Sequence, residues 1–277
     1  MSNQNAIRTG LLLCATVACG EDSVTDPPDV PFGETTLVVI VNPVVNTLNQ
    51  ASLPVLPGTA RDGVNVAVAG GPSGQTDASG VVVLTPVAGG SRTLSLSGGG
   101  SSGQVQASVV ERDLRELAVA LDGNAATILA DIQYPFGGTV VEVTPSMSVA
   151  EVNAQLARSN VIVFFRAGSY SGNLDFSGSS VTLFGEGAQG GTVTLQGDVQ
   201  VTGSRNRIRG ARITGTLTVP GSDFGMSFSR VQGAAAVSGS DASLLHNGFC
   251  IAPAITGSGA TLLGNAGLAP IAPPAGC

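Results

Sequence analysis

The feature that most constrains this chain is an internal repeat of eighteen residues in its last third. The stretch VSGSDASLLHNG begins at Val237, and a near copy, ITGSGATLLGNA, begins at Ile255. When the sequence is written in rows of eighteen, residues of one kind fall into columns. The apolar columns are Val201, Val219, Val237 and Ile255; Ile208, Met226, Leu244 and Leu262; and Leu195, Ile213, Val231 and Phe249. The other columns are Gly203, Gly221, Gly239 and Gly257; Ser204, Ser222, Ser240 and Ser258; and Asn247 above Asn265. Extending the rows backwards places Leu183 and Gly185 in the columns of Val201 and Gly203.

A repeat at constant spacing indicates a solenoid, because each unit leaves its faces open and buries them only by stacking on its neighbours. Eighteen residues at about 3.3 Å each give a perimeter of roughly 60 Å, enough for three short strands and three turns. Tandem strands of an antiparallel sandwich, the alternative, would not need the same columns in four rows. Parallel crossovers are right-handed as a rule, so we expect a short right-handed parallel β-helix.

A short helix is expected just before the repeats. Ser148 and Glu151 have the spacing of a capping box, which opens a helix through about Ala157. The apolar run Val161–Phe165 follows, and a turn with Gly168 and Tyr170 comes next. This order resembles the entry to the pectin lyase-like right-handed parallel β-helix family, with Ala167 in place of the usual proline of that turn. The resemblance implies a helix that covers the open end of the first coil.

The middle of the chain has the pattern of a β-sandwich. Glycine, proline and polar turns separate five β-rich runs, whose alternation indicates sheets with one buried face. The runs are Thr35–Asn42, Val64–Gly70, Gly80–Pro86, Arg92–Gly98 and Gly103–Val110. The segment Gly74–Gly98 resembles the carboxypeptidase regulatory-like family, in which a turn with the pattern of Thr76, Asp77 and Gly80 leads into a strand. Asp77 is expected to form this turn and not to act as a catalyst.

The first residues have the pattern of an export signal. Arg8 precedes the apolar stretch Leu11–Ala18, and TVAC, which ends at Cys19, resembles a bacterial lipobox. The resemblance implies cleavage before Cys19, lipidation of its thiol and attachment to a membrane of the cell envelope, at the outer membrane or cell surface. The alternative is an ordinary secretory signal cut after Ala18, which predicts a secreted protein. The acidic, proline-containing stretch that follows is expected to remain a mobile tether.

Together these patterns predict an all-β chain. An N-terminal β-sandwich precedes a short right-handed parallel β-helix with an N-terminal capping helix. The expected division is a signal peptide at 1–18, a flexible tether at 19–34, a carboxypeptidase regulatory-like β-sandwich at 35–130 and a right-handed parallel β-helix at 131–277.

Two cysteines remain once the signal is removed and Cys19 is lipidated. In an oxidising compartment Cys250 and Cys277 are expected to form a disulfide that stabilises the fold by roughly 3 kcal/mol. The alternative is two unpaired buried thiols. The single histidine, His246, has no partner at ligand spacing, so we expect no metal site and no cofactor.

Five arginines lie within 26 residues of a chain whose net charge is −7. The acidic balance argues against nucleic-acid binding. Arg205, Arg207 and Arg209 alternate, so they share one face of an extended segment and Ile208 points inward. Arg212 lies one row before Arg230 in the same column. Guanidinium groups match carboxylates and sulfates, so an acidic polysaccharide is a candidate partner, with an envelope protein as another. The favoured interpretation is a solvated polar face that keeps the sheet soluble, because aromatic platforms for sugars are lacking nearby.

Catalysis is the competing interpretation of the repeats. Asp223 and Asp241 share a column, and two stacked carboxylates about 5 Å apart could support retaining glycoside hydrolysis. Both also follow Gly-Ser in turns, where aspartate bonds to the backbone. We therefore expect no catalytic residues and a non-catalytic, exported surface lipoprotein that has a structural role or binds a glycan or another partner. The alternative is a polysaccharide lyase or glycoside hydrolase, or a degenerate descendant of one, that acts on an acidic polysaccharide.

Overall fold

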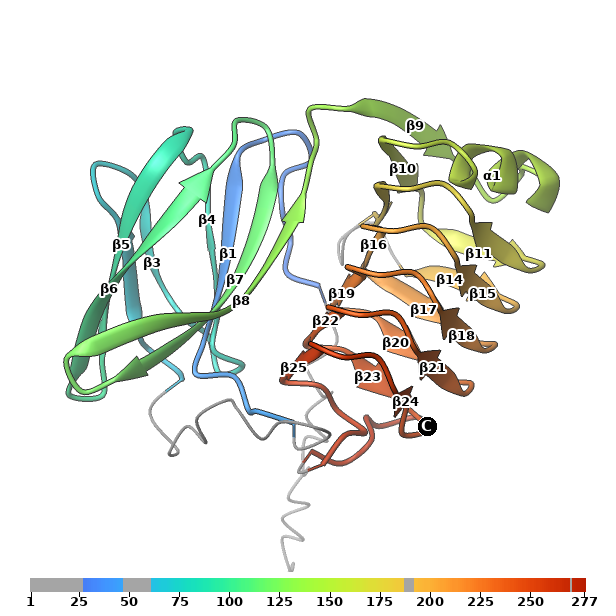
Figure 1. The fold of residues 1–277 in the computed structure, drawn as a ribbon. Helices are drawn as coiled ribbons and strands as arrows, with labels where there is room; N and C mark the ends of the chain where they lie inside the picture. The colour runs from blue at the N-terminus through green and yellow to red at the C-terminus, as the bar shows by residue number, and fades with distance from the viewer. Residues whose placement is uncertain (1–26, 47–60, 187–191, 270) are drawn as a thin grey trace, which may run out of the picture.

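The computed structural model describes residues 27–46, 61–186, 192–269 and 271–277, which form a nearly all-β chain with one short helix. Figure 1 shows two parts side by side. The first eight strands build two four-stranded sheets, and the remaining strands build three parallel sheets. The predicted all-β class is therefore confirmed.

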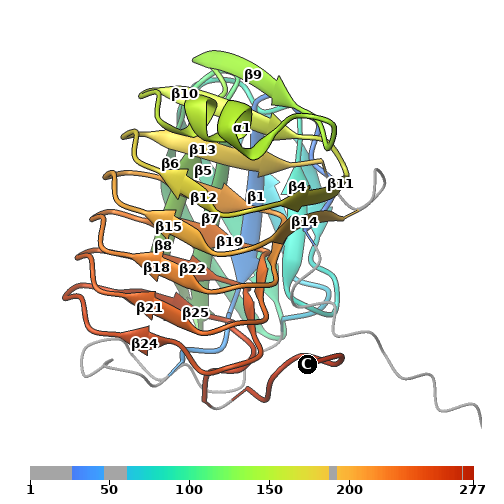
Figure 2. The same cartoon turned by 90° about the vertical axis from the view of Figure 1, so that its right-hand side faces the viewer.

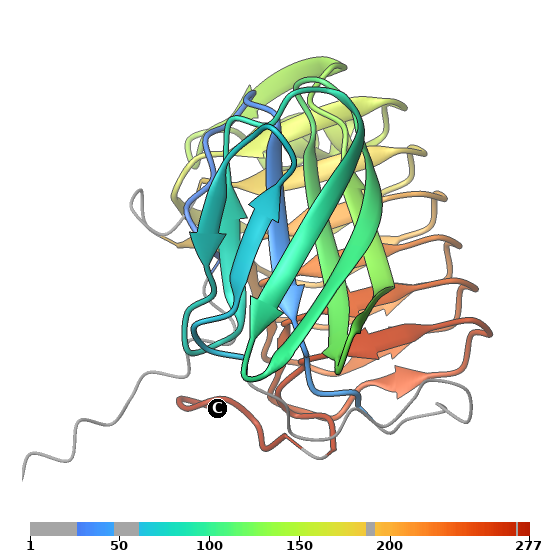
Figure 3. The ribbon, with the colours of Figure 1, turned by 90° about the vertical axis from the view of Figure 1, so that its left-hand side faces the viewer.

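The N-terminal part encloses its own apolar core between two sheets. The inner sheet, which faces the rest of the molecule, contains β4 (Val81–Leu84), β1 (Thr36–Val41), β7 (Leu114–Asp122) and β8 (Ala125–Tyr134). The outer sheet contains β3 (Ser73–Gln75), β2 (Asn65–Val68), β5 (Gly90–Gly98) and β6 (Ser101–Val109). Figure 3 shows the outer sheet in front of the inner sheet, with the parallel strands behind both.

Each of the five predicted runs overlaps a strand, but β3, β7 and β8 were not anticipated. The boundary predicted between residues 130 and 131 falls inside β8, which belongs to the inner sheet as far as Tyr134. The expectation of one buried face is wrong for β1, because all six of its residues are buried. Its second face lies against the parallel sheets, so both sides of the strand are covered.

The C-terminal part winds through three parallel sheets, which we call walls, and one strand of each wall makes a coil (Figure 2). Wall 1 contains β9 (Thr139–Val143), β10 (Val161–Phe165), β13 (Val181–Gly185), β16 (Arg207–Arg209), β19 (Gly225–Ser227), β22 (Ser243–Leu245) and β25 (Thr261–Leu263). Wall 2 contains β11 (Gly168–Ser171), β14 (Val193–Gln196), β17 (Ala211–Ile213), β20 (Arg230–Val231) and β23 (Gly248–Phe249). Wall 3 contains β12 (Leu174–Phe176), β15 (Val199–Val201), β18 (Leu217–Val219), β21 (Ala235–Val237) and β24 (Ala254–Ile255).

The register of these coils follows the repeat over its last four rows. Ile208 pairs with Met226 in wall 1, and Val219 pairs with Val237 in wall 3, each at eighteen residues. The earlier row is different, because Leu183 pairs with Ile208, twenty-five residues later. Phe176, not Leu183, takes the place above Val201. The coil between β13 and β16 is longer than the repeat, so counting back by eighteen gave the wrong column.

The glycine column allows neighbouring coils to approach closely. A Cβ atom on Gly239 would lie 1.9 Å from the carbonyl oxygen of Gly221, and one on Gly257 would lie 1.9 Å from that of Gly239. Real Cβ atoms do not come this close to an oxygen, so the stacking of these turns requires glycine.

Buried asparagines link one coil to the next. The side-chain oxygen of Asn265 accepts hydrogen bonds from the backbone and side-chain nitrogens of Asn247, both at 3.0 Å. Asn46, from the segment after β1, repeats this arrangement below Asn265 and accepts from its backbone at 2.9 Å. The N-terminal part therefore supplies the last rung of the asparagine ladder.

Both ends of the stack are covered. The predicted helix is present as α1 (Val149–Leu156), with Ser148 as its N-cap and a capping box with Glu151. At the other end Gly264 donates to the carbonyl of Val44, and Val45 forms a bridge with Leu263. The C-terminal tail is joined there to the coil by the disulfide described below.

The two parts share a second apolar core between the inner sheet and wall 1. Ile40 and Ile132 of the inner sheet belong to it, together with Phe184 and Leu245 of the stack. The segment just before β1 also packs here, since Val30 is buried and the ring of Phe32 lies 4.7 Å from that of Phe164. The expectation of a mobile tether as far as residue 34 is therefore wrong for residues 27–34, because apolar and aromatic contacts hold them against the body.

Candidate ligand-binding groove

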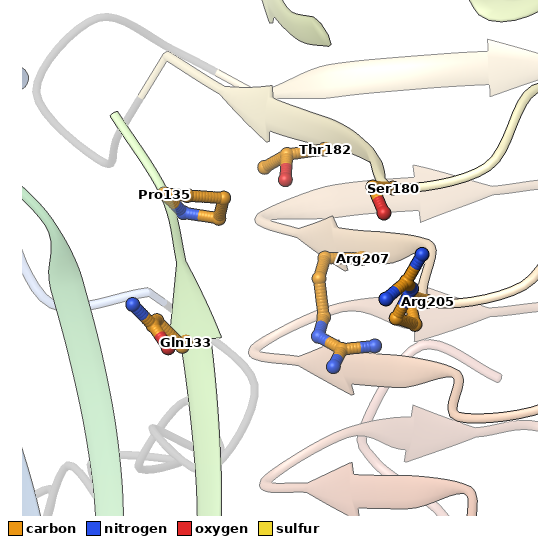
Figure 4. Close-up of a pocket in the computed structure, with 6 residues that line it drawn as sticks. All are labelled: Gln133, Pro135, Ser180, Thr182, Arg205 and Arg207. Atoms are coloured by element: carbon orange, nitrogen blue, oxygen red, sulfur yellow. The ribbon is translucent and has the colours of Figure 1, made fainter. Parts of the chain in front are cut away.

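A groove of about 190 Å³ opens between the two parts, at one end of their shared core. Figure 4 shows its lining residues as sticks, two from the end of the inner sheet, two from wall 1 and two from the corners just before it. They are Gln133, Pro135, Ser180, Thr182, Arg205 and Arg207.

The register between neighbouring coils sets the positions of the other four residues. Thr182 pairs with Arg207 in neighbouring strands, so their side chains lie side by side on the outward face, while Ile208 is buried inside the coil. Ser180 and Arg205 occupy the same corner one coil apart, with φ angles of 57° and 58°. The backbone of Ser180 donates to the carbonyl of Ser204, which fixes this alignment.

Arg207 is held by an ion pair. Its Nη2 lies 2.9 Å from Oδ1 of Asp223, which occupies the next corner of the stack. Its Nη1 also donates to backbone carbonyls of Asn206 and Asp223. The Arg207 side chain is 16% exposed and the Asp223 side chain 51% exposed, so the pair lies at the mouth of the groove. An ion pair this close to water contributes little stability, but it fixes the direction of the guanidinium.

Arg205 is exposed, and its side chain makes no hydrogen bond or ion pair with the residues that the structure describes. Figure 4 shows its guanidinium beside that of Arg207. One cation in the groove is therefore neutralised by Asp223, and the second is available to an anion.

Arg209 lies outside this site, which corrects the expectation of three arginines on one solvated face. Its side chain is fully buried and pairs with Glu116 of β7 at 2.7 Å. Its guanidinium also lies over the rings of Phe184 and Phe228. The alternation is correct for Arg207 and Arg209, which share β16, but Arg205 lies at the corner before the strand, with a φ of 58°. The inner sheet covers the outward face at Arg209, so Arg209 cannot reach a dissolved ligand.

The partner of Arg209 belongs to a buried polar network. The Tyr134 hydroxyl donates to Glu116 at 3.3 Å and contacts the Ser227 hydroxyl. Burial, and secondarily the charge of Glu116, raise the pKa of Tyr134 well above its usual value, so the phenol stays protonated. This network joins the two parts next to the groove.

Arg212 and Arg230 lie on wall 2 and line no part of the groove. They pair in neighbouring strands, which confirms their predicted column. Arg230 donates to the carbonyl of Ala275 and lies near the sulfur of Cys277, so it contacts the C-terminal tail. The five arginines predicted as candidates therefore do not form one patch.

Asp223 and Asp241 occupy successive corners, as their shared column predicts. Their φ angles are 53° and 58°, and the backbone of each donates to a serine carbonyl of the next coil. Within the described ranges no group of three or more His, Cys, Asp and Glu side chains could hold a metal ion. The turn function of Asp77 is also visible, since its Oδ1 accepts from the backbone of Ser79 and Val81, both at 2.9 Å.

Cys250 and Cys277 form a disulfide with a Cα–Cα distance of 5.2 Å. This confirms the predicted pairing and excludes the alternative of two free thiols. Cys19 and the expected signal peptide at 1–18 lie outside the described residues. Among the residues described, no helix is long and apolar enough to cross a membrane.

The eighteen-residue spacing did not identify Ser180 and Thr182 as site residues, because both precede the longer coil that interrupts this spacing. A different signal would have found the corner, namely the tripeptide Gly-Ser-x. From residue 171 onwards it occurs at 178–180, 203–205, 221–223, 239–241 and 257–259. Aligning these tripeptides places Ser180 above Arg205 without assuming a constant spacing. Nothing in the local sequence marked Gln133 or Pro135.

Comparisons of the chain with protein-family models, with curated proteins and with solved structures found no match.

Proposed function

We propose that this chain is a non-catalytic, exported surface lipoprotein that binds an acidic polysaccharide in the groove. In this proposal the N-terminal part is a carboxypeptidase regulatory-like β-sandwich. The coils form a right-handed parallel β-helix of the pectin lyase-like kind, and the lipid on Cys19 anchors the protein to an envelope membrane. The resemblances in the sequence support the fold assignments and the anchor.

The observation that carries the binding proposal is the uncompensated guanidinium of Arg205 beside the Arg207–Asp223 pair. A planar guanidinium can bind a carboxylate or sulfate with two parallel hydrogen bonds. The hydroxyls of Ser180 and Thr182 and the amide of Gln133 line the same groove and match the hydroxyls of a sugar. Sites that enclose a drug-sized ligand have volumes of roughly 300–1,000 Å³. The smaller groove therefore fits one charged unit of a longer chain.

Binding of oligogalacturonate, measured by isothermal titration calorimetry, tests this proposal. Arg205→Ser should weaken binding by about tenfold, and affinity should fall as salt rises from about 20 to 500 mM, because the contact is ionic and exposed. Arg212→Ser is the matched control, since it removes an equal charge from wall 2 and should change affinity less than about twofold. Equal effects of the two substitutions would indicate a general charge effect and would reject the groove as the site.

Membrane attachment is tested separately. In a bacterial host, the intact chain should incorporate labelled palmitate and sediment with membranes, whereas Cys19→Ser should do neither. The substitution Cys14→Ser is the control, because Cys14 precedes the expected cleavage site. A Cys19→Ser protein that is still labelled and still membrane-bound would contradict the anchor.

A further inference from the structure

A second hollow lies in the N-terminal part, away from the groove, at the end of the β5–β6 hairpin. Its volume is about 450 Å³. Residues of β5, of β6 and of the turn between β7 and β8 line it. They are Ser95, Leu96, Ser97, Ser102, Gly103, Gln104 and Asn124. We call this hollow the hairpin notch.

The hydrogen-bonding side chains of the notch are all uncharged. Ser95 and Ser97 alternate with Leu94 and Leu96, whose side chains are buried in the core, so both serines face away from it. Gln104 stands directly opposite Ser95, and its amide donates to the serine hydroxyl at 3.2 Å. No ionisable side chain lines the notch, although the chain has 31 charged residues.

The notch has a rigid floor. β5 and β6 pair without interruption from Gly90 to Gly98, and the backbone of Ser102 donates to the carbonyl of Gly123 at 2.7 Å. The start of β8 also lies against Gly103, where a Cβ atom would lie 2.5 Å from the backbone nitrogen of Ala126. The backbone at Asn124 is thereby held beside the hairpin, so a ligand has to order only the side chains of the site.

Several polar side chains of the notch make no hydrogen bond within the described part of the protein. The side chains of Ser97, Ser102 and Asn124 make no hydrogen bond with the described part of the chain. Each of them, like Gln104, can both donate and accept. A sugar hydroxyl also does both, whereas a phosphate or carboxylate only accepts and would gain no ionic contact here. Because the Ser102 backbone nitrogen is already bonded to Gly123, a peptide strand added at the edge of β6 cannot pair with that nitrogen.

We propose that the hairpin notch binds a neutral oligosaccharide through uncharged side chains, independently of the acidic ligand proposed for the groove. Aromatic stacking is absent from the residues that line the notch, so hydrogen bonds alone must hold the sugar. The expected affinity is therefore weak, with a Kd on the order of 1 mM, and it should be nearly independent of salt.

The experiment uses the full chain without its signal peptide, with cellotetraose, maltotetraose and mannotetraose as probes in ligand-observed NMR titrations. At least one probe should bind, with less than about twofold change in Kd between roughly 20 and 500 mM salt. The double substitution Gln104→Ala and Asn124→Ala should weaken binding at least about fivefold. Gln106→Ala is the matched control, because Gln106 lies on the same face of β6 but bonds to Thr93 outside the notch.

Two outcomes would overturn the proposal. One is the absence of binding by every probe at about 20 mM, and the other is a Kd that the double substitution leaves unchanged. Arg205→Ser separates this site from the groove, since it should leave the neutral sugar bound and weaken only oligogalacturonate. Loss of both ligands with Arg205→Ser would place the neutral sugar in the groove instead.

Discussion

Arg209 and His246 are both buried near the junction of the two parts, but burial affects their charges differently. Arg209 keeps its charge because Glu116 lies 2.7 Å away. His246 is 3% exposed, and neither ring nitrogen has a hydrogen-bond partner in the described part of the chain. Burial, aided by the nearby charge of Arg61, lowers the pKa of His246 to about 4, and Asp77 opposes this only weakly. His246 is therefore neutral near pH 7.

The pKa of His246 predicts a loss of stability in mild acid. The unfolded chain binds a proton near pH 6.5, whereas the folded chain binds it only near pH 4. The contribution of neutral His246 is therefore complete above about pH 6.5 and is lost as the pH falls toward 4. Between pH 7 and pH 5 the loss should be about 2 kcal/mol, measured by urea unfolding.

His246→Asn is the control for this titration, because asparagine tolerates the φ of 51° found at this position and does not ionise. The free energy of unfolding of this variant should vary about 2 kcal/mol less over the same range. An unchanged pH dependence would show that other groups, and not His246, govern the acid response.

Among the structural elements, the coils were the most predictable from sequence. Each coil meets nearly the same surroundings as the one before it, so the same residue kinds recur and a local pattern reveals the columns. Ile208, Met226, Leu244 and Leu262 illustrate this. Irregular spacing removes that signal, which is why Leu183 was placed wrongly. The capping box at Ser148 was also predictable, since all its contacts lie within one turn.

The glycine column gives a prediction at this scale. Gly239→Ala should lower the free energy of unfolding by at least about 2 kcal/mol, because the new methyl would meet the Gly221 carbonyl oxygen at 1.9 Å. Gly137→Ala is the matched control, since nothing lies within 4 Å of the added atom. It should leave stability within about 0.5 kcal/mol, as measured by urea unfolding. If both variants were equally stable, close stacking would not be the reason for the column.

At the scale of the whole molecule, the sequence did not reveal how its two parts meet. Glu116 and Arg209 are 93 residues apart, and each looks like an ordinary outward residue of a strand. The groove depends on this junction, which is why Arg205 and Arg207 could be chosen from sequence while Gln133 and Pro135 could not. The continuous apolar run of β1 was the one local sign that both its faces are covered.

The shared core predicts that the stack needs the N-terminal part. A chain that begins at Gly137 would expose Phe184, Phe228 and Leu245 and would leave Arg209 without Glu116. Removing one partner of a buried ion pair costs about 3–5 kcal/mol. We expect this fragment to bind a hydrophobic dye and to aggregate, whereas residues 27–277 should unfold cooperatively as a monomer. A monomeric, cooperatively folded fragment would instead show two independent domains.

The rung formed by Asn46 has a consequence for how this protein can change in evolution. Repeat arrays ordinarily lengthen when a coil is duplicated, and each added coil moves the end of the stack by about 4.8 Å. Here Asn46 must reach Asn265 while Glu116 reaches Arg209, and both acceptors are fixed in the N-terminal part. An extra coil between these two points would break one contact or the other. The N-terminal part therefore sets the number of coils between Arg209 and Asn265.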